Sequence, residues 1–295
     1  MSSVLDLIGN TPLAEISRII EKPGVRVFCK LEGNNPGGSV KDRAAYYMIK
    51  NALEKGEIKS GMKLIEATSG NTGIALAMIA RLFNLEIELV MPENSTIERV
   101  LVMKAYGAKV TLTPAEGSIE ASIDYANKKV ESGGYHMLNQ FANPSNYKAH
   151  FHTTGPEIWQ DTHGKVTHFI SSMGTTGTIM GVSRYLKEQN PNIKIVGVQP
   201  KEGSRIPGIR RWQKAYLPKI FDPDRIDQII EVSENEAANM ARRLAAEEAI
   251  FAGMSSGGAM AAAVKLSKKI DQGILVVIIC DRGDRYLSSN LFSST

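Results

Sequence analysis

The sequence of 295 residues lacks the features of membrane-spanning, secreted and disulfide-rich proteins. Its longest uninterrupted apolar run, residues 274–280, is far shorter than the roughly 20 residues that span a bilayer. The first residues have neither the basic nor the apolar region of a signal peptide. The two cysteines, Cys29 and Cys280, lie too far apart in the sequence to indicate a metal clip or a redox pair. We therefore expect a soluble, cytoplasmic protein with no disulfide framework and no metal site.

The sequence also lacks any long block of charge of one sign. Its 35 Lys and Arg residues and 31 Asp and Glu residues are spread along the chain, which leaves a net charge of only +4. Nucleic-acid-binding proteins normally gather basic residues into a stripe or patch, so we expect no nucleic-acid partner. The apolar fraction of 43% is ordinary, which excludes a disordered or collagen-like chain.

Short β-branched segments alternate with longer segments of helical periodicity along the chain. The predicted strands cover residues 25–31, 63–67, 86–91, 110–112, 135–141, 167–173, 193–198, 229–232 and 274–279. The predicted helices cover residues 41–56, 72–83, 97–106, 118–130, 147–160, 177–188, 234–249 and 258–270. This alternation predicts an α/β fold of mainly parallel sheets with helices on both faces. So many strands are unusual for one open sheet, so we expect two sheets, divided near residues 143–144.

Three glycine-rich segments lie where a predicted strand is followed by a helix. They are Glu66-Ala-Thr-Ser-Gly-Asn-Thr-Gly73, Ser171-Ser-Met-Gly-Thr-Thr-Gly-Thr178 and Gly253-Met-Ser-Ser-Gly-Gly258. At the carboxyl ends of parallel strands such turns face a ligand cleft, and helix N-termini there favour an anion. Each segment alone is more typical of a simple helix cap, but three in one chain favour a binding site. None carries a nucleotide-binding motif, so the pattern indicates a smaller phosphorylated cofactor.

Lys41 follows a further glycine-rich turn, Gly33-Asn-Asn-Pro-Gly-Gly-Ser-Val-Lys41. The lysine lies at or near a predicted helix start, where a cation is electrostatically unfavourable. A lysine that forms a Schiff base would explain this placement.

Together these segments resemble the motifs of the fold type II, or β-family, enzymes that use pyridoxal 5'-phosphate (PLP). Asn34-Asn-Pro-Gly-Gly-Ser-Val-Lys41 is similar to the family's cofactor-lysine segment, and Ile8-Gly-Asn-Thr-Pro-Leu13 also matches. The resemblance extends over about residues 8–288. It implies two open, twisted, mainly parallel sheets flanked by helices, with the cofactor in the cleft between them. It also implies an N-terminal α/β domain of residues 36–143, with a mobile part at about 84–130, and a C-terminal domain of residues 1–35 and 144–295.

The resemblance assigns a role to each motif residue. Lys41 would hold the cofactor as a Schiff base and act as the catalytic base and acid. The other residues expected to bind the cofactor are Asn71, Gly174, Thr175, Thr176, Gly177, Thr178 and Ser255. The residues expected to bind the substrate carboxylate are Thr68, Ser69, Gly70, Thr72 and Gln140.

Within the family the chain is most similar to the B branch of the O-acetylserine sulfhydrylases. The features that favour this branch are Gly-Thr-Thr-Gly-Thr at residues 174–178 and the segments 207–212 and 278–286. The implied reaction is a β-replacement that forms L-cysteine from O-acetyl-L-serine and sulfide through α-aminoacrylate. The resemblance further implies a homodimer, no appended regulatory domain and no complex with serine acetyltransferase.

The long segment 201–227 carries the arginines that suggest a second sulfur donor. Arg210 and Arg211 would attract an anionic second substrate. The resemblance to the B branch implies that this substrate is thiosulfate, a dianion, which would give S-sulfocysteine. The alternative is that one arginine packs structurally and the other is solvated. Cys280 would line the same substrate pocket, although an ordinary buried core thiol explains it as well.

Other functions on the same scaffold stay open at this stage. One alternative is a relative that uses O-phosphoserine or forms cystathionine. Another is a catalytically silent ligand-binding protein, which Lys41 argues against. None of the five histidines is expected to be essential.

Overall fold

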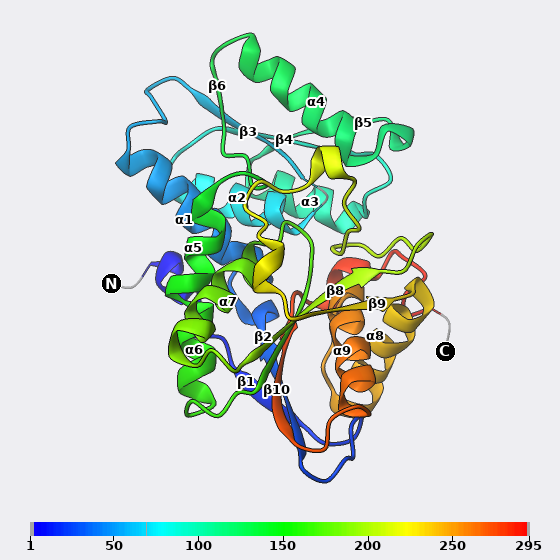
Figure 1. Cartoon of the computed structure of the whole chain (residues 1–295). Coiled ribbons are helices and arrows are strands. Elements are labelled where there is room, and N and C mark those ends of the chain that lie inside the picture. Colours follow the sequence, from blue (N-terminus) through cyan, green and yellow to red (C-terminus); the bar gives the residue numbers. More distant parts are fainter. Residues whose placement is uncertain (1–2, 69, 294–295) are drawn as a thin grey trace.

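The computed structural model describes residues 3–68 and 70–293, and in this part of the chain the strands form two sheets (Figure 1). The six-stranded sheet has the order β1 (Leu13–Ile16), β2 (Val25–Leu31), β10 (Gly273–Ile279), β7 (His168–Ser172), β8 (Lys194–Pro200) and β9 (Gln228–Val232). The four-stranded sheet has the order β5 (Lys109–Thr113), β4 (Ile87–Pro92), β3 (Lys63–Ala67) and β6 (Tyr135–Met137). The pairs are parallel except β1 with β2. The predicted α/β fold with two mainly parallel sheets is confirmed.

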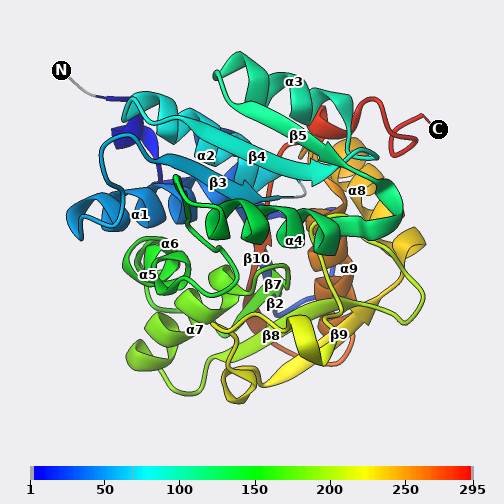
Figure 2. The same ribbon diagram turned by 90° about the horizontal axis from the view of Figure 1, so that it is seen from above.

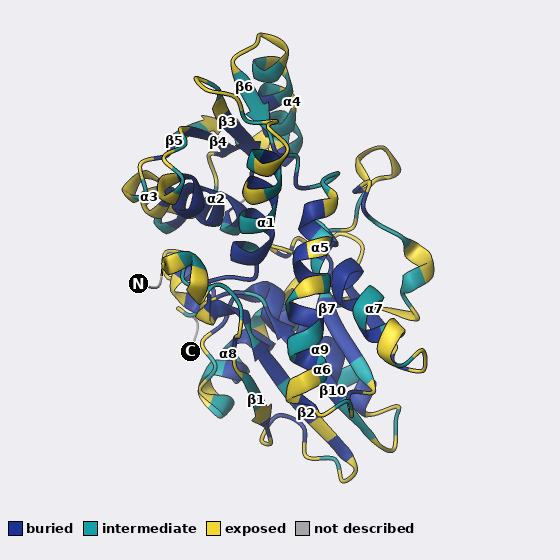
Figure 3. Cartoon of the chain, turned by 90° about the vertical axis from the view of Figure 1, so that its left-hand side faces the viewer, coloured by how far each residue is buried: buried dark blue, intermediate teal, exposed yellow. Residues whose placement is uncertain are grey.

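Helices cover both faces of each sheet (Figures 1 and 2). On the four-stranded sheet, α4 (Ser118–Glu131) packs on one face, and the other face carries α1 (Lys41–Glu54), α2 (Asn71–Leu82) and α3 (Ile97–Ala105). On the six-stranded sheet, α8 (Glu234–Glu248) and α9 (Met254–Ser267) lie on one face. The opposite face carries α5 (Pro144–His152), α6 (Thr154–Asp161) and α7 (Gly177–Gln189). Figure 3 shows the consequence, since the strands are mostly buried and the exposed residues lie on loops and outer helix faces.

Several predicted boundaries were wrong, each for a local reason. The predicted strand 135–141 ends at Met137, because Asn139 adopts a left-handed conformation with φ +55°. The predicted helix 147–160 is two helices that part at Thr153, and the first begins after the cap Asn143. The helix α9 begins at Met254, four residues before its predicted start. The antiparallel edge strand β1 was missed, because four residues are too few to show a periodicity.

The strands of the four-stranded sheet all lie within residues 36–143. That this part forms a separate domain, with a mobile region at about 84–130, stays a prediction. No helix in the described ranges is long and apolar enough to cross a membrane.

A buried ion cluster ties the start of α1 to the six-stranded sheet. The side chains of Arg43 and Glu32 are both fully buried, and Arg43 Nε lies 2.7 Å from Glu32 Oε2. Arg43 Nη1 lies 2.6 Å from Glu157 Oε1 on α6, and the buried Lys30 of β2 pairs with the same carboxylate at 2.9 Å. Since Arg43 is only two residues from Lys41, this cluster fixes where the first turn of α1 lies.

Removal of Arg43 should therefore destabilise the protein strongly. In Arg43→Met the carboxylate of Glu32 stays buried without its main partner, which should cost about 3–5 kcal/mol of unfolding free energy. Urea unfolding of the purified protein measures this. The control is Lys50→Ala, which removes an exposed pair with Glu54 on the same helix and should change stability by less than about 1 kcal/mol. Equal stability losses in the two variants would contradict the prediction.

Candidate active site

The turns that follow β3 and β7 open onto one cavity of about 740 Å³ between the two sheets. The lining includes Lys41, Asn71, Thr72, Gln140, Gly174, Thr175, Gly208, Arg210 and Arg211. The third turn lies directly behind this lining, because a Cβ on Gly208 would be only 3.2 Å from Ser255 Cβ. Two of the three glycine-rich turns predicted to face a common cleft therefore line this cavity, whereas the third lies behind its wall.

Lys41 is the first residue of α1 and lies at the wall of the cavity. The backbone before it is anchored to the end of β10, since Val40 N–H donates to the carbonyl of Cys280 at 2.8 Å. Lys41 N–H is itself 3.3 Å from Ser39 Oγ. The lysine is half-buried, so its amine is held near the cavity without being sealed from it.

The 68–73 turn presents hydroxyl and amide groups at the start of α2. Thr68 Oγ1 accepts hydrogen bonds from the N–H groups of Gly70, at 3.1 Å, and Gly73, at 3.0 Å. Thr72 Oγ1 donates to Gln140 Oε1 at 2.8 Å. These contacts bring together four of the five residues predicted to hold the substrate carboxylate; the fifth, Ser69, lies outside the described residues.

The 174–178 turn forms a cradle at the start of α7. Thr176 is left-handed, with φ +69°, and its Oγ1 is buried with no hydrogen-bond partner among the described residues. The first N–H groups of a helix have no partner within it, so they are further donors at this point. A Cβ on Gly177 would lie 2.0 Å from Asn146 Oδ1, so only glycine fits there. A helix N-terminus and a buried unpartnered hydroxyl fit a phosphate group.

Ser255 and Cys280 lie behind the cavity. Ser255 is in the first turn of α9, only 3% exposed, and its carbonyl accepts from Ser172 Oγ at 2.7 Å. Burial raises the pKa of the Cys280 thiol to about 11, although the positive charge of Lys41 acts in the opposite direction. Cys280 is therefore a neutral thiol at physiological pH, and its expected substrate contact stays a prediction.

Asn71 is held by residues from the end of the chain that sequence reasoning did not assign to the site. Its Nδ2 donates to Asp281 Oδ2 at 2.6 Å, and its Oδ1 accepts from Arg285 Nη1 at 2.7 Å. Tyr286 OH also donates to Asp281 Oδ2, at 2.8 Å. From the sequence, the charges of the segment 281–285 are expected to form structural pairs at the end of the last strand, with the edge of the cleft as the alternative; the structure places Asp281 and Arg285 against Asn71, which its charged pattern did not indicate.

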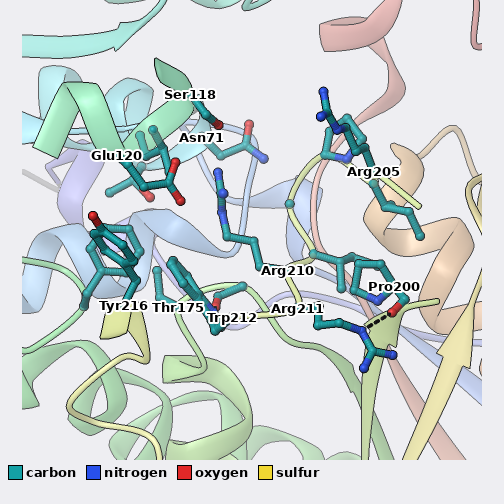
Figure 4. Close-up of a pocket in the computed structure, with 18 of the residues that line it drawn as sticks. Asn71, Ser118, Glu120, Thr175, Pro200, Arg205, Arg210, Arg211, Trp212 and Tyr216 are labelled. Carbon is teal, nitrogen blue, oxygen red and sulfur yellow. Dashed lines mark hydrogen bonds between the residues drawn. The ribbon is translucent and has the colours of Figure 1, made fainter. Parts of the chain in front are cut away.

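The two arginines of the 201–227 segment point in different directions (Figure 4). Arg211 forms an ion pair with Glu231, and its Nε donates to the carbonyl of Pro200 at 3.2 Å. Arg210 extends into the cavity, with its guanidinium carbon 5.4 Å from the centre of the Trp212 ring. Burial lowers the pKa of Arg210, while the charge of Glu120 raises it. Trp212 Nε1 donates to the carbonyl of Gly174 at 2.8 Å, so this segment is docked on the 174–178 turn.

Three buried side chains next to these turns were missed from the sequence. Both carboxylate oxygens of Glu66 accept backbone N–H groups from residues 139 and 140. Asn146 Nδ2 donates to Thr175 Oγ1 at 3.1 Å, and His150 Nε2 lies 3.3 Å from Thr178 Oγ1. Burial holds the pKa of His150 well below 6.5, so its ring is neutral. The one available signal was Glu66, a charge next to the apolar residues Leu64 and Ile65 in a predicted parallel strand.

The fold and the site define an α/β protein that binds a small molecule between two mainly parallel sheets. The family model described as "Pyridoxal-phosphate dependent enzyme" matches residues 4–281, and the chain belongs to this family. It is 56% identical over 290 residues to a protein of Pseudomonas aeruginosa named cysteine synthase B, with 98% of this chain and 97% of the relative covered.

Two solved structures are similar over nearly the whole chain. A cysteine synthase from Entamoeba histolytica superposes with a TM-score of 0.94 at 37% identity, covering 100% of this chain and 91% of the other. An O-acetylserine-dependent cystathionine β-synthase from Helicobacter pylori superposes with a TM-score of 0.93 at 36% identity, covering 99% of each chain.

The cradle described above fits the family's cofactor, pyridoxal phosphate. The buried unpartnered hydroxyl of Thr176 and the N-terminus of α7 suit its phosphate, and Lys41 suits its aldehyde. When bound, the cofactor withdraws electrons from the substrate's Cα, which makes proton removal there and loss of a group from Cβ possible.

Glu66 predicts a pH dependence of stability. Burial raises the pKa of its carboxyl from 4.5 to about 7, although three backbone N–H groups act against this. The folded state therefore binds the proton more tightly than the unfolded chain. This contribution to stability is fully present below about pH 4.5 and is lost as the pH rises through about 7. Across that range it lowers the unfolding free energy by up to about 1.4 kcal/mol per pH unit.

Glu66→Gln should flatten this part of the profile, measured by urea unfolding at a series of pH values. Glu54→Gln, at an exposed position of α1, is the control and should keep the wild-type slope. An unchanged slope in Glu66→Gln would show that Glu66 does not titrate in this range.

Proposed function

We propose that this protein forms L-cysteine from O-acetyl-L-serine and sulfide in a pyridoxal-phosphate-dependent β-replacement that releases acetate. The observation that carries the proposal is the placement of Lys41 at the wall of a cavity shared with the 68–73 and 174–178 turns. The similarity to relatives named cysteine synthase supports the choice of reaction.

Lys41 has two tasks in this reaction. It holds the cofactor covalently at rest, and during turnover its free Nζ removes the proton from the substrate's Cα and returns it to the product. The family resemblance assigns Ser255, behind the cavity wall, to the ring nitrogen of the cofactor, where it would offer a neutral hydroxyl in place of a carboxylate. A neutral partner does not force a proton onto that nitrogen, which favours elimination at Cβ over transamination.

The substrate carboxylate binds at the N-terminus of α2. Thr68, Gly70 and Thr72 carry the hydroxyl and amide groups of this proposed site. In the structure the Gly70 N–H donates to Thr68 Oγ1 and the Thr72 hydroxyl to Gln140 Oε1, so these two donors would exchange their present partners for the carboxylate. A helix N-terminus favours a carboxylate by its unpaired N–H groups and its positive end. Ser69 belongs to the same proposed set from the sequence alone.

The proposal predicts that Lys41→Ala abolishes the synthesis of L-cysteine. The rate should fall by about a thousandfold or more, because both the covalent anchor and the proton carrier are lost. The assay measures L-cysteine from O-acetyl-L-serine and sulfide with purified protein supplied with pyridoxal phosphate. Lys50→Ala, an exposed lysine on the same helix, should keep the wild-type rate. A wild-type protein that binds the cofactor but makes no L-cysteine would overturn the proposal.

We further propose that thiosulfate is a second sulfur donor, giving S-sulfocysteine. Support comes from Arg210, a half-buried cation in the cavity lining that a dianion entering the cavity would meet. Arg211 contributes less, because its guanidinium is already paired with Glu231. An arginine fork suits the oxygens of a sulfur oxyanion.

Arg210→Ala should therefore raise the KM for thiosulfate about tenfold while changing the KM for sulfide less, since a charge-assisted contact contributes on the order of 1.5–3 kcal/mol. Arg211→Ala is the matched comparison and should change the thiosulfate KM less than Arg210→Ala does. Steady-state kinetics with each donor measure both values. If neither variant changes the thiosulfate KM, the arginines have no part in donor binding.

The cystathionine-forming relative with the same fold supports a second candidate reaction. The same protein assayed with L-homocysteine in place of sulfide, or with O-phospho-L-serine in place of O-acetyl-L-serine, separates these activities.

Our proposal also includes a cytoplasmic homodimer that forms no complex with serine acetyltransferase and whose residues 84–130 move when the substrate carboxylate binds.

A further inference from the structure

Gln140 is surrounded by buried partners that the proposed reaction does not by itself require. The residue is 4% exposed. Its side chain faces the 68–73 turn, where Oε1 accepts from Thr72 Oγ1 at 2.8 Å and Nε2 donates to the carbonyl of Ala67 at 2.9 Å. The orientation of this side chain therefore depends on where the backbone of Gln140 is held.

Glu66 holds the N–H side of that backbone. The strand β6 ends at Met137, so the residues after it have no strand partner on β3. The carboxylate of Glu66 takes the place of the absent strand-to-strand hydrogen bonds. Its Oε1 accepts from Gln140 N–H at 3.0 Å and its Oε2 from Asn139 N–H at 2.9 Å. Glu66 is only 1% exposed, so water cannot substitute freely for these bonds.

Asn146, in the first turn of α5, holds the carbonyl side. Its Nδ2 donates to Gln140 O at 2.8 Å and also to Thr175 Oγ1 at 3.1 Å. Its Oδ1 faces Gly177, where a Cβ would come within 2.0 Å. One buried carboxamide thus touches both Gln140 and the 174–178 turn, and it is 2% exposed.

We infer that Glu66 and Asn146 are positioning residues that hold Gln140 from its two backbone sides, and that Asn146 also couples Gln140 to the 174–178 turn. The inference rests on the proposed function, in which Gln140 binds the substrate carboxylate and Thr175 the cofactor phosphate. It predicts an asymmetry, because Glu66 reaches only the substrate side whereas Asn146 reaches both sides.

The asymmetry is tested with Glu66→Gln and Asn146→Ala. In Glu66→Gln one of the two accepting oxygens is replaced by an NH₂ group. That group is a donor, so it cannot accept the backbone N–H that faces it. At about pH 8, it should raise the KM for O-acetyl-L-serine about tenfold and change the dissociation constant of pyridoxal phosphate by less than about twofold. Asn146→Ala should raise both quantities about tenfold, since it removes both donated bonds. The dissociation constant is measured by equilibrium dialysis of the holoenzyme, without reference to activity.

The control is Asn143→Ala, at the N-cap of the same helix. Asn143 caps α5 by accepting from Ser145 N–H, so this variant should lower the unfolding temperature while leaving the cofactor dissociation constant within about twofold of wild type. A double-mutant cycle of Asn146→Ala with Thr175→Val tests the contact itself. If Asn146 acts through Thr175, its effect on cofactor binding should shrink when the Thr175 hydroxyl is absent.

Two results would overturn the inference. One is that Asn146→Ala lowers the unfolding temperature like Asn143→Ala but leaves both the cofactor affinity and the substrate KM unchanged. The other is that Glu66→Gln weakens cofactor binding as much as Asn146→Ala does. Failure of the proposed function has a different signature, because wild-type protein would then bind no cofactor or form no product.

Discussion

The structure depends on the way parallel strands and the helices that follow them share one edge of a sheet. In each βα unit the helix begins at the carboxyl end of the strand, so unpaired N–H groups gather there. The turns after β3 and β7 both lie at such an edge, and the two sheets place these edges around one cavity. A carboxylate and a phosphate can therefore bind close together without two separate clusters of basic side chains. The cofactor and the substrate need this proximity for chemistry at a single carbon atom.

Buried charge holds the site in place at a cost in stability. The Arg43–Glu32–Glu157 cluster fixes the first turn of α1 and hence Lys41, while Glu66 fixes the backbone after β6. Neither arrangement contributes much to the unfolding free energy by itself, since apolar side chains of similar volume are often as stabilising or more so. Charged groups, however, accept hydrogen bonds from particular donors, so they specify one geometry. For Glu66 the free-energy cost of burying the charged carboxylate appears as a pKa raised to about 7.

The fold could be predicted largely from periodicity, and the errors have local causes. The parallel strands were recognised because burial on both faces makes them continuous β-branched segments, as at residues 274–279. The edge strand β1 is too short for this signal. The end of β6 depends on Asn139, whose left-handed backbone is set by contacts with Glu66 that lie 73 residues away in the sequence. The break at Thr153 lies two residues before Gly155-Pro156, so the sequence indicates an interruption of this helix but not its exact position.

The sequence alone determined which chemistry to propose for the site, because glycines at strand-to-helix turns and a lysine after a glycine-rich loop need no tertiary information to indicate an anion cradle and a Schiff base. Only the tertiary structure decided which side chains act together. Arg210 and Arg211 are adjacent and chemically identical, yet one enters the cavity and the other pairs with Glu231. Asn146 and Glu66 carry no motif, and their contacts with Gln140 arise from packing between elements distant in sequence. Local patterns report what a residue can do, whereas long-range packing selects its partner.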